Sequence, residues 1–128
     1  MLLLDDDPST LLVLRAVLES KGVEVLESLD AKAAVKHCQE RPGGIDVLVA
    51  DVILGDTNGP AVVRRVKYLQ PEMRLLFISG FALEDLVRRG ILDPHDLAAD
   101  CAAFLQKPFT AAALLENVHR LLSSSAAN

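Results

Sequence analysis

The sequence contains no tryptophan, only two cysteines and no long run of apolar residues. A helix that crosses a membrane needs about 20 consecutive apolar residues, whereas the apolar runs here are short and end at charged or turn-forming residues. No membrane insertion is therefore expected. Cys38 and Cys101 form neither a CxxC pair nor a metal-binding spacing. We expect both to be small buried residues of a protein in a reducing cytoplasm.

Basic residues are scarce as well. The chain has 13 Lys and Arg against 18 Asp and Glu, a formal net charge of −5, and no stretch of the sequence concentrates the basic residues. Direct binding to nucleic acid or to an anionic membrane is therefore not expected. The apolar start, Met1 to Leu4, is too short for a signal-peptide core and lacks a basic lead. A chain of 128 residues fits one domain, which we expect to cover residues 1–122, with a flexible tail at residues 123–128.

Five apolar segments have the composition of buried strands and alternate with helical patterns. The predicted strands are residues 1–4, 23–26, 45–50, 73–78 and 101–105. The predicted helices begin after Asp7, span residues 30–39, follow Gly59 as far as about Leu69, span residues 82–89, and begin after Thr110. This alternation predicts an α/β protein of the flavodoxin-like, doubly wound class. Its five-stranded parallel sheet has the strand order 2-1-3-4-5 and carries five helices on its two faces.

Polar residues follow the ends of the predicted strands. In this strand order the winding reverses between strands 1 and 3, and ligands of such sheets bind beyond the carboxyl ends of the strands at that point. The residues at those ends are Asp5, Asp6, Asp51, Ser79 and Lys107. Taken singly, each fits a helix cap, a turn or a solvated loop, and we interpret Asp7 as a cap. Their convergence on one edge of the sheet predicts a functional site.

The residue types at this edge suit phosphoryl transfer. Clustered carboxylates raise one another's pKa, and Mg2+ prefers one or two carboxylates together with water and phosphate oxygens. Asp6 and Asp51 offer such carboxylates, with Asp5 close by. Lys107 adds a positive charge that can pair with Asp51 and later with phosphate oxygens, and Ser79 adds a hydroxyl. Phosphoryl transfer mainly requires alignment and charge neutralisation, and this set of side chains can supply both.

Four segments resemble, in order, the signature segments of response-regulator receiver domains. They are Leu2-Leu3-Leu4-Asp5-Asp6-Asp7, Val47-Leu48-Val49-Ala50-Asp51, Phe77-Ile78-Ser79-Gly80 and Phe104-Leu105-Gln106-Lys107-Pro108-Phe109. The resemblance implies that Mg2+ is bound by Asp5, Asp6, Asp51 and the backbone carbonyl of Ile53. It further implies that Asp51 is the phosphorylated residue, with Lys107 beside it. Ser79 and Phe104 then correspond to the residues of the conformational switch.

The same resemblance implies partners and an output. A histidine kinase or a histidine phosphotransfer protein would donate the phosphoryl group from a phosphohistidine. A downstream protein or domain would then recognise the surface of helix 4, strand 5 and helix 5. Such a domain assists its own phosphorylation and is not an enzyme in the usual sense. The sequence leaves open whether the chain forms a homodimer, and whether it is a stand-alone regulator or a piece of a hybrid kinase.

Two features depart from the commonest receiver pattern. Gly55 stands where many receivers have proline, which suggests a more flexible loop after Asp51. Ser79 and Lys107 are 107 − 79 = 28 positions apart, several more than usual, and residues 90–96 are expected to hold the extra length. With the sequences around Ser79 and Lys107, this makes the chain similar to receivers of hybrid histidine kinases.

Two other classes of protein compete with this interpretation. Asp5-Asp6-Asp7-Pro8-Ser9 also fits the first motif of haloacid-dehalogenase-like phosphatases, in which Asp5 would be the nucleophile. That alternative leaves Asp51 without a role, lacks the later acidic pair, and leaves no room for the customary cap domain. The second competitor is an interaction module that has lost its chemistry. It is weakened because every residue of the site is present.

Overall fold

The computed structural model describes residues 1–54, 57–97 and 102–126, and within them the chain forms a five-stranded parallel sheet. The strands are β1 Leu2–Leu4, β2 Leu26–Ser28, β3 Val47–Asp51, β6 Arg74–Ser79 and β7 Ala102–Gln106. They lie in the order β2-β1-β3-β6-β7, which is the predicted order 2-1-3-4-5 when these strands are counted along the chain. β4 (Ile53–Leu54) and β5 (Thr57–Asn58) form a two-stranded antiparallel hairpin that the sequence does not predict.

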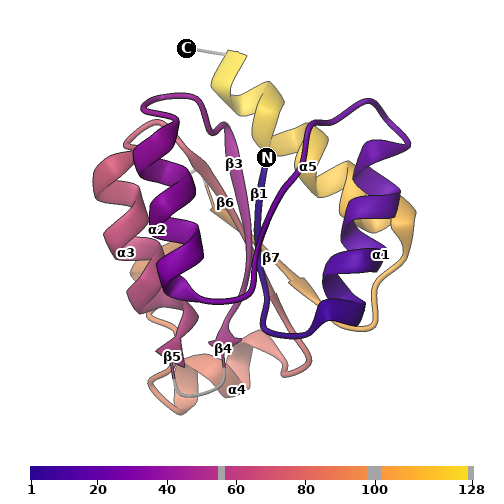
Figure 1. Cartoon of the computed structure of the whole chain (residues 1–128). Coiled ribbons are helices and arrows are strands. Elements are labelled where there is room, and N and C mark those ends of the chain that lie inside the picture. Colours follow the sequence, from indigo (N-terminus) through magenta and orange to yellow (C-terminus); the bar gives the residue numbers. More distant parts are fainter. Residues whose placement is uncertain (55–56, 98–101, 127–128) are drawn as a thin grey trace.

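The helices form a layer on each face of the sheet (Figure 1). α1 (Pro8–Glu19) and α5 (Ala111–Ala126) cover one face, and α2 (Ala31–Glu40) and α3 (Gly59–Leu69) cover the other. α4 (Leu83–Arg88) and the 3-10 turn Pro94–Leu97 lie in the connection between β6 and β7. The predicted five helices and the flavodoxin-like arrangement are confirmed. Within the described ranges, no helix is long and apolar enough to span a membrane.

Alternate residues of the central strands fill two separate cores. Leu48 and Ala50 of β3 belong to the core under α2 and α3, whereas Val47 and Val49 point into the core under α1 and α5. This alternation follows from the strand geometry, in which successive side chains face opposite sides of the sheet. Because both faces are covered, the interior strands β1, β3 and β6 are apolar, with polar residues only at the ends of β3 and β6.

Side chains at the helix starts fix where the connecting loops end. Asp7 accepts a hydrogen bond from the Ser9 N–H at 3.0 Å and precedes Pro8, the first residue of α1. Thr110 Oγ1 accepts a hydrogen bond from the Ala113 N–H at 3.0 Å at the start of α5. Side-chain oxygens at these positions satisfy N–H groups that have no partner within the helix. The cap predicted at Asp7 is therefore confirmed, and Asp30 and Thr110 cap α2 and α5 in the same way.

Most boundaries lie within one or two residues of the predictions, and those of β2 and α5 differ by more. β2 begins at Leu26 and ends at Ser28, later than the predicted residues 23–26, because Val23 still donates its N–H to Leu18 of α1. α5 continues to Ala126, into the segment expected to be a tail, since no glycine or proline interrupts it there. β7 begins at Ala102. Cys101, Gly55, and residues 127–128 of the expected tail lie outside the described residues.

Gln70 joins the ends of α2 and α3. Its side chain is almost completely buried, and its Nε2 donates hydrogen bonds to the carbonyl oxygens of Cys38 at 3.1 Å and Arg41 at 2.6 Å. These carbonyls belong to the last turn and the C-cap of α2, where helical partners are missing. The Gln70 amide thus supplies the hydrogen bonds that two carbonyl groups at the end of α2 lack within the helix. It also links the end of α2 to the residue that follows α3.

Candidate functional site

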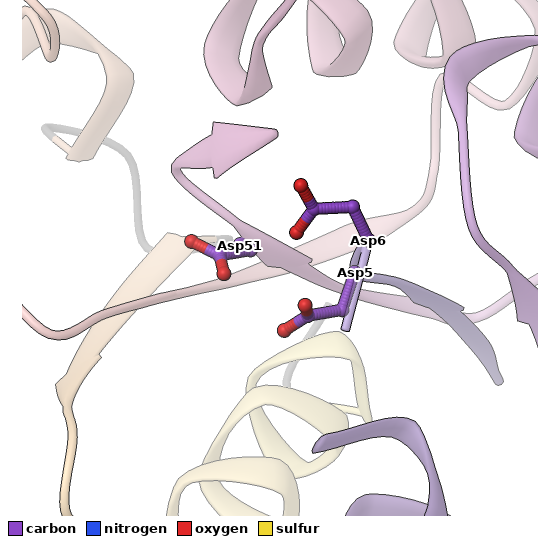
Figure 2. A group of neighbouring side chains, drawn as sticks. All are labelled: Asp5, Asp6 and Asp51. Atoms are coloured by element: carbon purple, nitrogen blue, oxygen red, sulfur yellow. The ribbon is translucent and has the colours of Figure 1, made fainter. Parts of the chain in front are cut away.

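Three carboxylates meet at the carboxyl edge of the sheet (Figure 2). Asp5 and Asp6 directly follow β1, and Asp51 is the last residue of the neighbouring β3. One carboxylate oxygen from each residue lies within 4.8 Å of the other two, and the side chains turn toward a shared space. Parallel pairing of β1 with β3 produces this convergence because it brings the carboxyl ends of both strands to the same edge.

Asp5 is the buried member of this group. Its side chain is 2% exposed, Oδ1 accepts a hydrogen bond from the Asp7 N–H at 2.9 Å, and Oδ2 lies 3.4 Å from the Lys107 Nζ. Burial raises the pKa of Asp5 above its ordinary value, and the charge of Asp51 acts in the same direction. The hydrogen bond from Asp7 and the ammonium of Lys107 oppose that shift.

Asp51 and Lys107 form an ion pair at the centre of the site. Asp51 Oδ2 lies 3.1 Å from the Lys107 Nζ, while Oδ1 accepts a hydrogen bond from the Ile53 N–H at 3.1 Å. The Asp51 side chain is 13% exposed, so it is mostly buried yet open to solvent. Asp6 is exposed. The group therefore has a buried carboxylate, a partly open one and a solvated one.

The loop after β7 places Lys107. Its backbone N–H donates a hydrogen bond to the Ser79 carbonyl at 2.7 Å, which continues the pairing of β7 with β6 beyond the strand. Burial lowers the pKa of Lys107, but the carboxylates of Asp51 and Asp5 outweigh that effect and hold the pKa above its ordinary value. Lys107 is thus a fixed positive charge at neutral pH, shared between two carboxylates.

The other predicted site residues occupy neighbouring positions. Ser79 ends β6 and is buried, and its Oγ accepts a hydrogen bond from the Phe81 N–H at 3.0 Å. Phe104 lies on β7 opposite Phe77 of β6 and is partly buried against the core under α2 and α3. Ile53 begins β4. Asp51, Asp5 and Lys107 are in direct contact, while Ser79 is joined to this group through the backbone of Lys107.

Sequence reasoning missed two features beside the site. Gly59 donates its N–H to the Val52 carbonyl at 2.7 Å and lies against the backbone that carries Asp51. The Arg89 guanidinium carbon lies 5.1 Å from the centre of the Phe81 ring, a cation–π contact. The presence of Gly59 is visible in the sequence, but its close backbone neighbours are not. No local pattern connects Arg89 with Phe81.

The donor set fits a hard divalent cation. With all three carboxylates ionised and Lys107 protonated, the site has a formal charge of −3 + 1 = −2. Carboxylate oxygens and water are the ligands that Mg2+ prefers, and the exposed Asp6 leaves room for water on the open side. Asp5, Asp6 and Asp51 are the residues that would hold it.

Comparisons with known proteins agree on one family. The family model described as "Response regulator receiver domain" matches residues 1–119. The chain is 30% identical over 123 residues to the sensor kinase CckA of Brucella abortus (strain 2308), a match that covers 95% of this chain and 12% of the kinase. It is 28% identical over 122 residues to the response regulator receiver protein CpdR of the same strain, covering 95% of each.

Solved structures agree as well. The crystal structure of the receiver domain from the hybrid histidine kinase CckA has a TM-score of 0.75 and 27% sequence identity, and the match covers 94% of this chain and 96% of that one. The chain thus has the length of CpdR but only a small part of the length of the CckA kinase. The family match covers nearly all of the sequence, including the four strand ends that form the site. The chain belongs to the response regulator receiver domain family of two-component systems.

Proposed function

We propose that Asp51 accepts a phosphoryl group from a phosphohistidine, with Mg2+ held by Asp5, Asp6, Asp51 and the backbone carbonyl of Ile53. The observation that carries this proposal is the Asp51 carboxylate, which lies 3.1 Å from the Lys107 ammonium and within 4.8 Å of the other two carboxylates. The Asp51 carboxylate is partly exposed, so a phosphoryl donor can reach it. The Lys107 ammonium beside it can balance the negative charge of the incoming phosphoryl group.

The reaction forms one bond and breaks another. A carboxylate oxygen of Asp51 attacks the phosphorus, the new P–O bond forms, and the P–N bond to the donor imidazole breaks. The imidazole nitrogen leaves with the bonding electron pair and takes up a proton. A Mg2+ ion held by Asp5, Asp6 and Asp51 would offset the negative charge of the transferred phosphoryl group. Lys107 exchanges its contact with the Asp51 carboxylate for one with a phosphoryl oxygen, and it stays charged throughout because the carboxylates raise its pKa.

Each further residue has a limited task in this proposal. Asp5 orients Lys107 through their 3.4 Å contact and completes the acidic group. Ser79 donates its hydroxyl hydrogen to a phosphoryl oxygen. The Ser79 Oγ now accepts a hydrogen bond from the Phe81 N–H, and the move of the side chain toward the phosphoryl group breaks that bond. Phe104 then moves into the space that the Ser79 side chain leaves. The altered surface of α4, β7 and α5 is the one that a downstream partner recognises.

The rival phosphatase reaction fits this geometry less well. Asp5, its nucleophile, is 2% exposed and already contacts the Asp7 N–H and the Lys107 ammonium. Neither the family model nor the relatives reported above point to a phosphatase. We therefore propose a stoichiometric phosphoryl acceptor in the cytoplasm, either free or as part of a hybrid kinase. Its donor is a histidine kinase or a histidine phosphotransfer protein, and a homodimer is one form the active state can take.

The test is incorporation of phosphate from radiolabelled acetyl phosphate in the presence of Mg2+. The wild-type protein is expected to take up one acid-stable, base-labile phosphoryl group, and Asp51→Asn to take up none. Asp46→Asn is a matched control because Asp46 is exposed just before β3, at its other end. Labelling of Asp51→Asn would overturn the proposal. So would steady turnover of p-nitrophenyl phosphate that survives Asp51→Asn and is lost in Asp5→Asn.

A further inference from the structure

The fold gathers positive charge on α2 and α3. These two helices carry five Lys or Arg and one acidic residue, a formal charge of 5 − 1 = +4 in a chain of −5, so the remaining residues carry −5 − 4 = −9. α2 and α3 lie side by side on one face of the sheet (Figure 1). This concentration of basic residues is not visible in the sequence because about twenty positions separate the two helices. The residues are Lys32, Lys36, Arg64, Arg65 and Lys67, with Glu40 as the acidic member.

A groove of about 340 Å³ opens between the two helices, lined by Val35 and Gln39 of α2 and by Arg65, Tyr68 and Leu69 of α3. Val35 and Leu69 are partly buried against the core and give the groove an apolar floor. Tyr68 is 87% exposed and is the only tyrosine of the chain. We call this groove and the basic residues around it the α2–α3 face.

Two charges of this face, on Lys32 and Arg65, are available to a partner. Within residues 1–54, 57–97 and 102–126, the exposed Arg65 and Lys32 have no ion-pair partner. Lys36 pairs with Glu40 only at 3.9 Å, and both side chains are more than half exposed. Lys67 is different, because its ammonium donates to the Met73 carbonyl.

We propose that the α2–α3 face is a docking site for an acidic amphipathic helix of a partner protein. An apolar side chain of that helix would enter the groove beside Tyr68, and its acidic side chains would meet Arg65 and Lys32. Tyrosine and arginine are enriched among the residues that dominate binding energy. Amphipathic helices commonly bind by placing apolar anchors in a groove, and complementary charge speeds and orients the encounter.

The size of the charged region favours a short acidic helix over a polyanion. A nucleic acid or an anionic bilayer would extend past α2 and α3 to the rest of the chain, which carries a formal charge of −9. Like charges repel such ligands. A single helix can stay within the basic face.

The site is separate from the acidic group. None of the residues that line the groove belongs to the group of Asp5, Asp6, Asp51 and Lys107. Binding is therefore expected to persist in Asp51→Asn, so the failure of one proposal leaves the other standing.

The experiment uses a dye-labelled amphipathic peptide with glutamate on one face and leucine on the other, and without tyrosine or tryptophan. Binding is measured by fluorescence anisotropy. The intrinsic emission of the protein comes from Tyr68, since the chain has no tryptophan, and gives a second readout located at the groove. The variants are Arg65→Glu and Tyr68→Ala. Lys21→Glu, at an exposed position just past α1, changes the net charge by the same amount as Arg65→Glu.

The peptide is expected to bind with a change in tyrosine emission, and more weakly as salt rises. Arg65→Glu and Tyr68→Ala should each weaken binding about tenfold, and Lys21→Glu by less than about twofold. If Arg65→Glu and Lys21→Glu weaken peptide binding equally, the effect depends only on the net charge of the protein, and the proposal is overturned. Absence of binding, or equal binding of a peptide with lysine in place of glutamate, would also overturn it. A ligand preference for duplex DNA or phosphatidylserine vesicles would assign the face to a different occupant.

Discussion

Gly59 lies so close to Asp51 that an ideal Cβ on the glycine would be 2.2 Å from the Asp51 carbonyl oxygen. Alanine normally stabilises a helix relative to glycine by roughly 0.5–1 kcal/mol, but here the added methyl group would displace the backbone at the end of β3. We expect Gly59→Ala to lower the free energy of unfolding by about 1–3 kcal/mol, as overpacking does. Urea denaturation measures the change.

Gly80→Ala is the control for this prediction. A Cβ at Gly80 would meet no atom within 4 Å, and its φ lies outside the positive range. Its stability should change by less than about 0.5 kcal/mol, as surface substitutions generally do. A stable Gly59→Ala protein with unchanged Asp51 labelling would show that the loop after β3 tolerates a different path.

Asp6 should matter more than Asp5 for metal affinity. Both oxygens of Asp5 are engaged within the protein, by the Asp7 N–H and the Lys107 ammonium, whereas Asp6 is exposed and free to contact the ion directly. We expect Asp5 to act mainly through metal-bound water. Asp6→Asn should therefore weaken Mg2+ binding by about tenfold or more, and Asp5→Asn by less. Isothermal titration with Mg2+ compares them, and equal or reversed losses would contradict the assignment.

Phosphorylation of Asp51 should change the surface of α4 and α5 through movements of Ser79 and Phe104. A hydrogen bond to the phosphoryl group would turn the Ser79 hydroxyl away from the Phe81 N–H and leave space for the Phe104 ring. In the wild type, a phosphoryl analogue should therefore shift amide resonances around Phe104 and along α4 and α5. Ser79→Ala should restrict the shifts to the acidic group. If the wild-type shifts never extend beyond that group, Phe104 is ordinary core.

The phosphorylated state should be long-lived because of Ile53 and Phe81. Hydrolysis needs a water in line with the phosphorus, and apolar side chains cannot hold one by hydrogen bonding. Phe81 is 42% exposed and is held under the Arg89 guanidinium. The double variant Ile53→Asn with Phe81→Glu should lose phosphate on the order of ten times faster, about 1.4 kcal/mol in barrier height.

Loss of label after removal of the donor measures that lifetime. Leu122→Glu is the matched control for the exposed position, since Leu122 is 40% exposed and lies at the far end of α5. It should leave the rate unchanged. A wild-type protein that loses phosphate as fast as the double variant would mean that these two side chains do not meet the attacking water.

The strand ends were predictable because they depend on local sequence. The apolar residues before Asp51 and the known behaviour of parallel sheets were enough to locate its contact with Lys107, 56 positions away. The start of β2 was not predictable, because Val23 has the composition of a strand residue although its N–H bonds to the Leu18 carbonyl. Composition alone does not reveal which carbonyl an N–H will reach.

Contacts that no motif marks could not be predicted. The Arg89 contact with Phe81 depends on how α4 turns back over the loop after β6. The charge of the α2–α3 face depends on two helices being neighbours, which the strand order implies but no motif marks. Sequence reasoning therefore finds the residues at the strand ends and misses side-chain contacts such as the one between Arg89 and Phe81.

The bridging amide of Gln70 also has a consequence for motion. Fraying of the α2 end and detachment of the segment after α3 both break its two hydrogen bonds, to Cys38 and Arg41. Neither end can open without releasing the other, so amide protons in the last turns of both helices should exchange with deuterium at similar rates. Gln70→Leu would separate those rates. The α2–α3 face would then lose its behaviour as one cooperative unit while the sheet beneath it stayed closed.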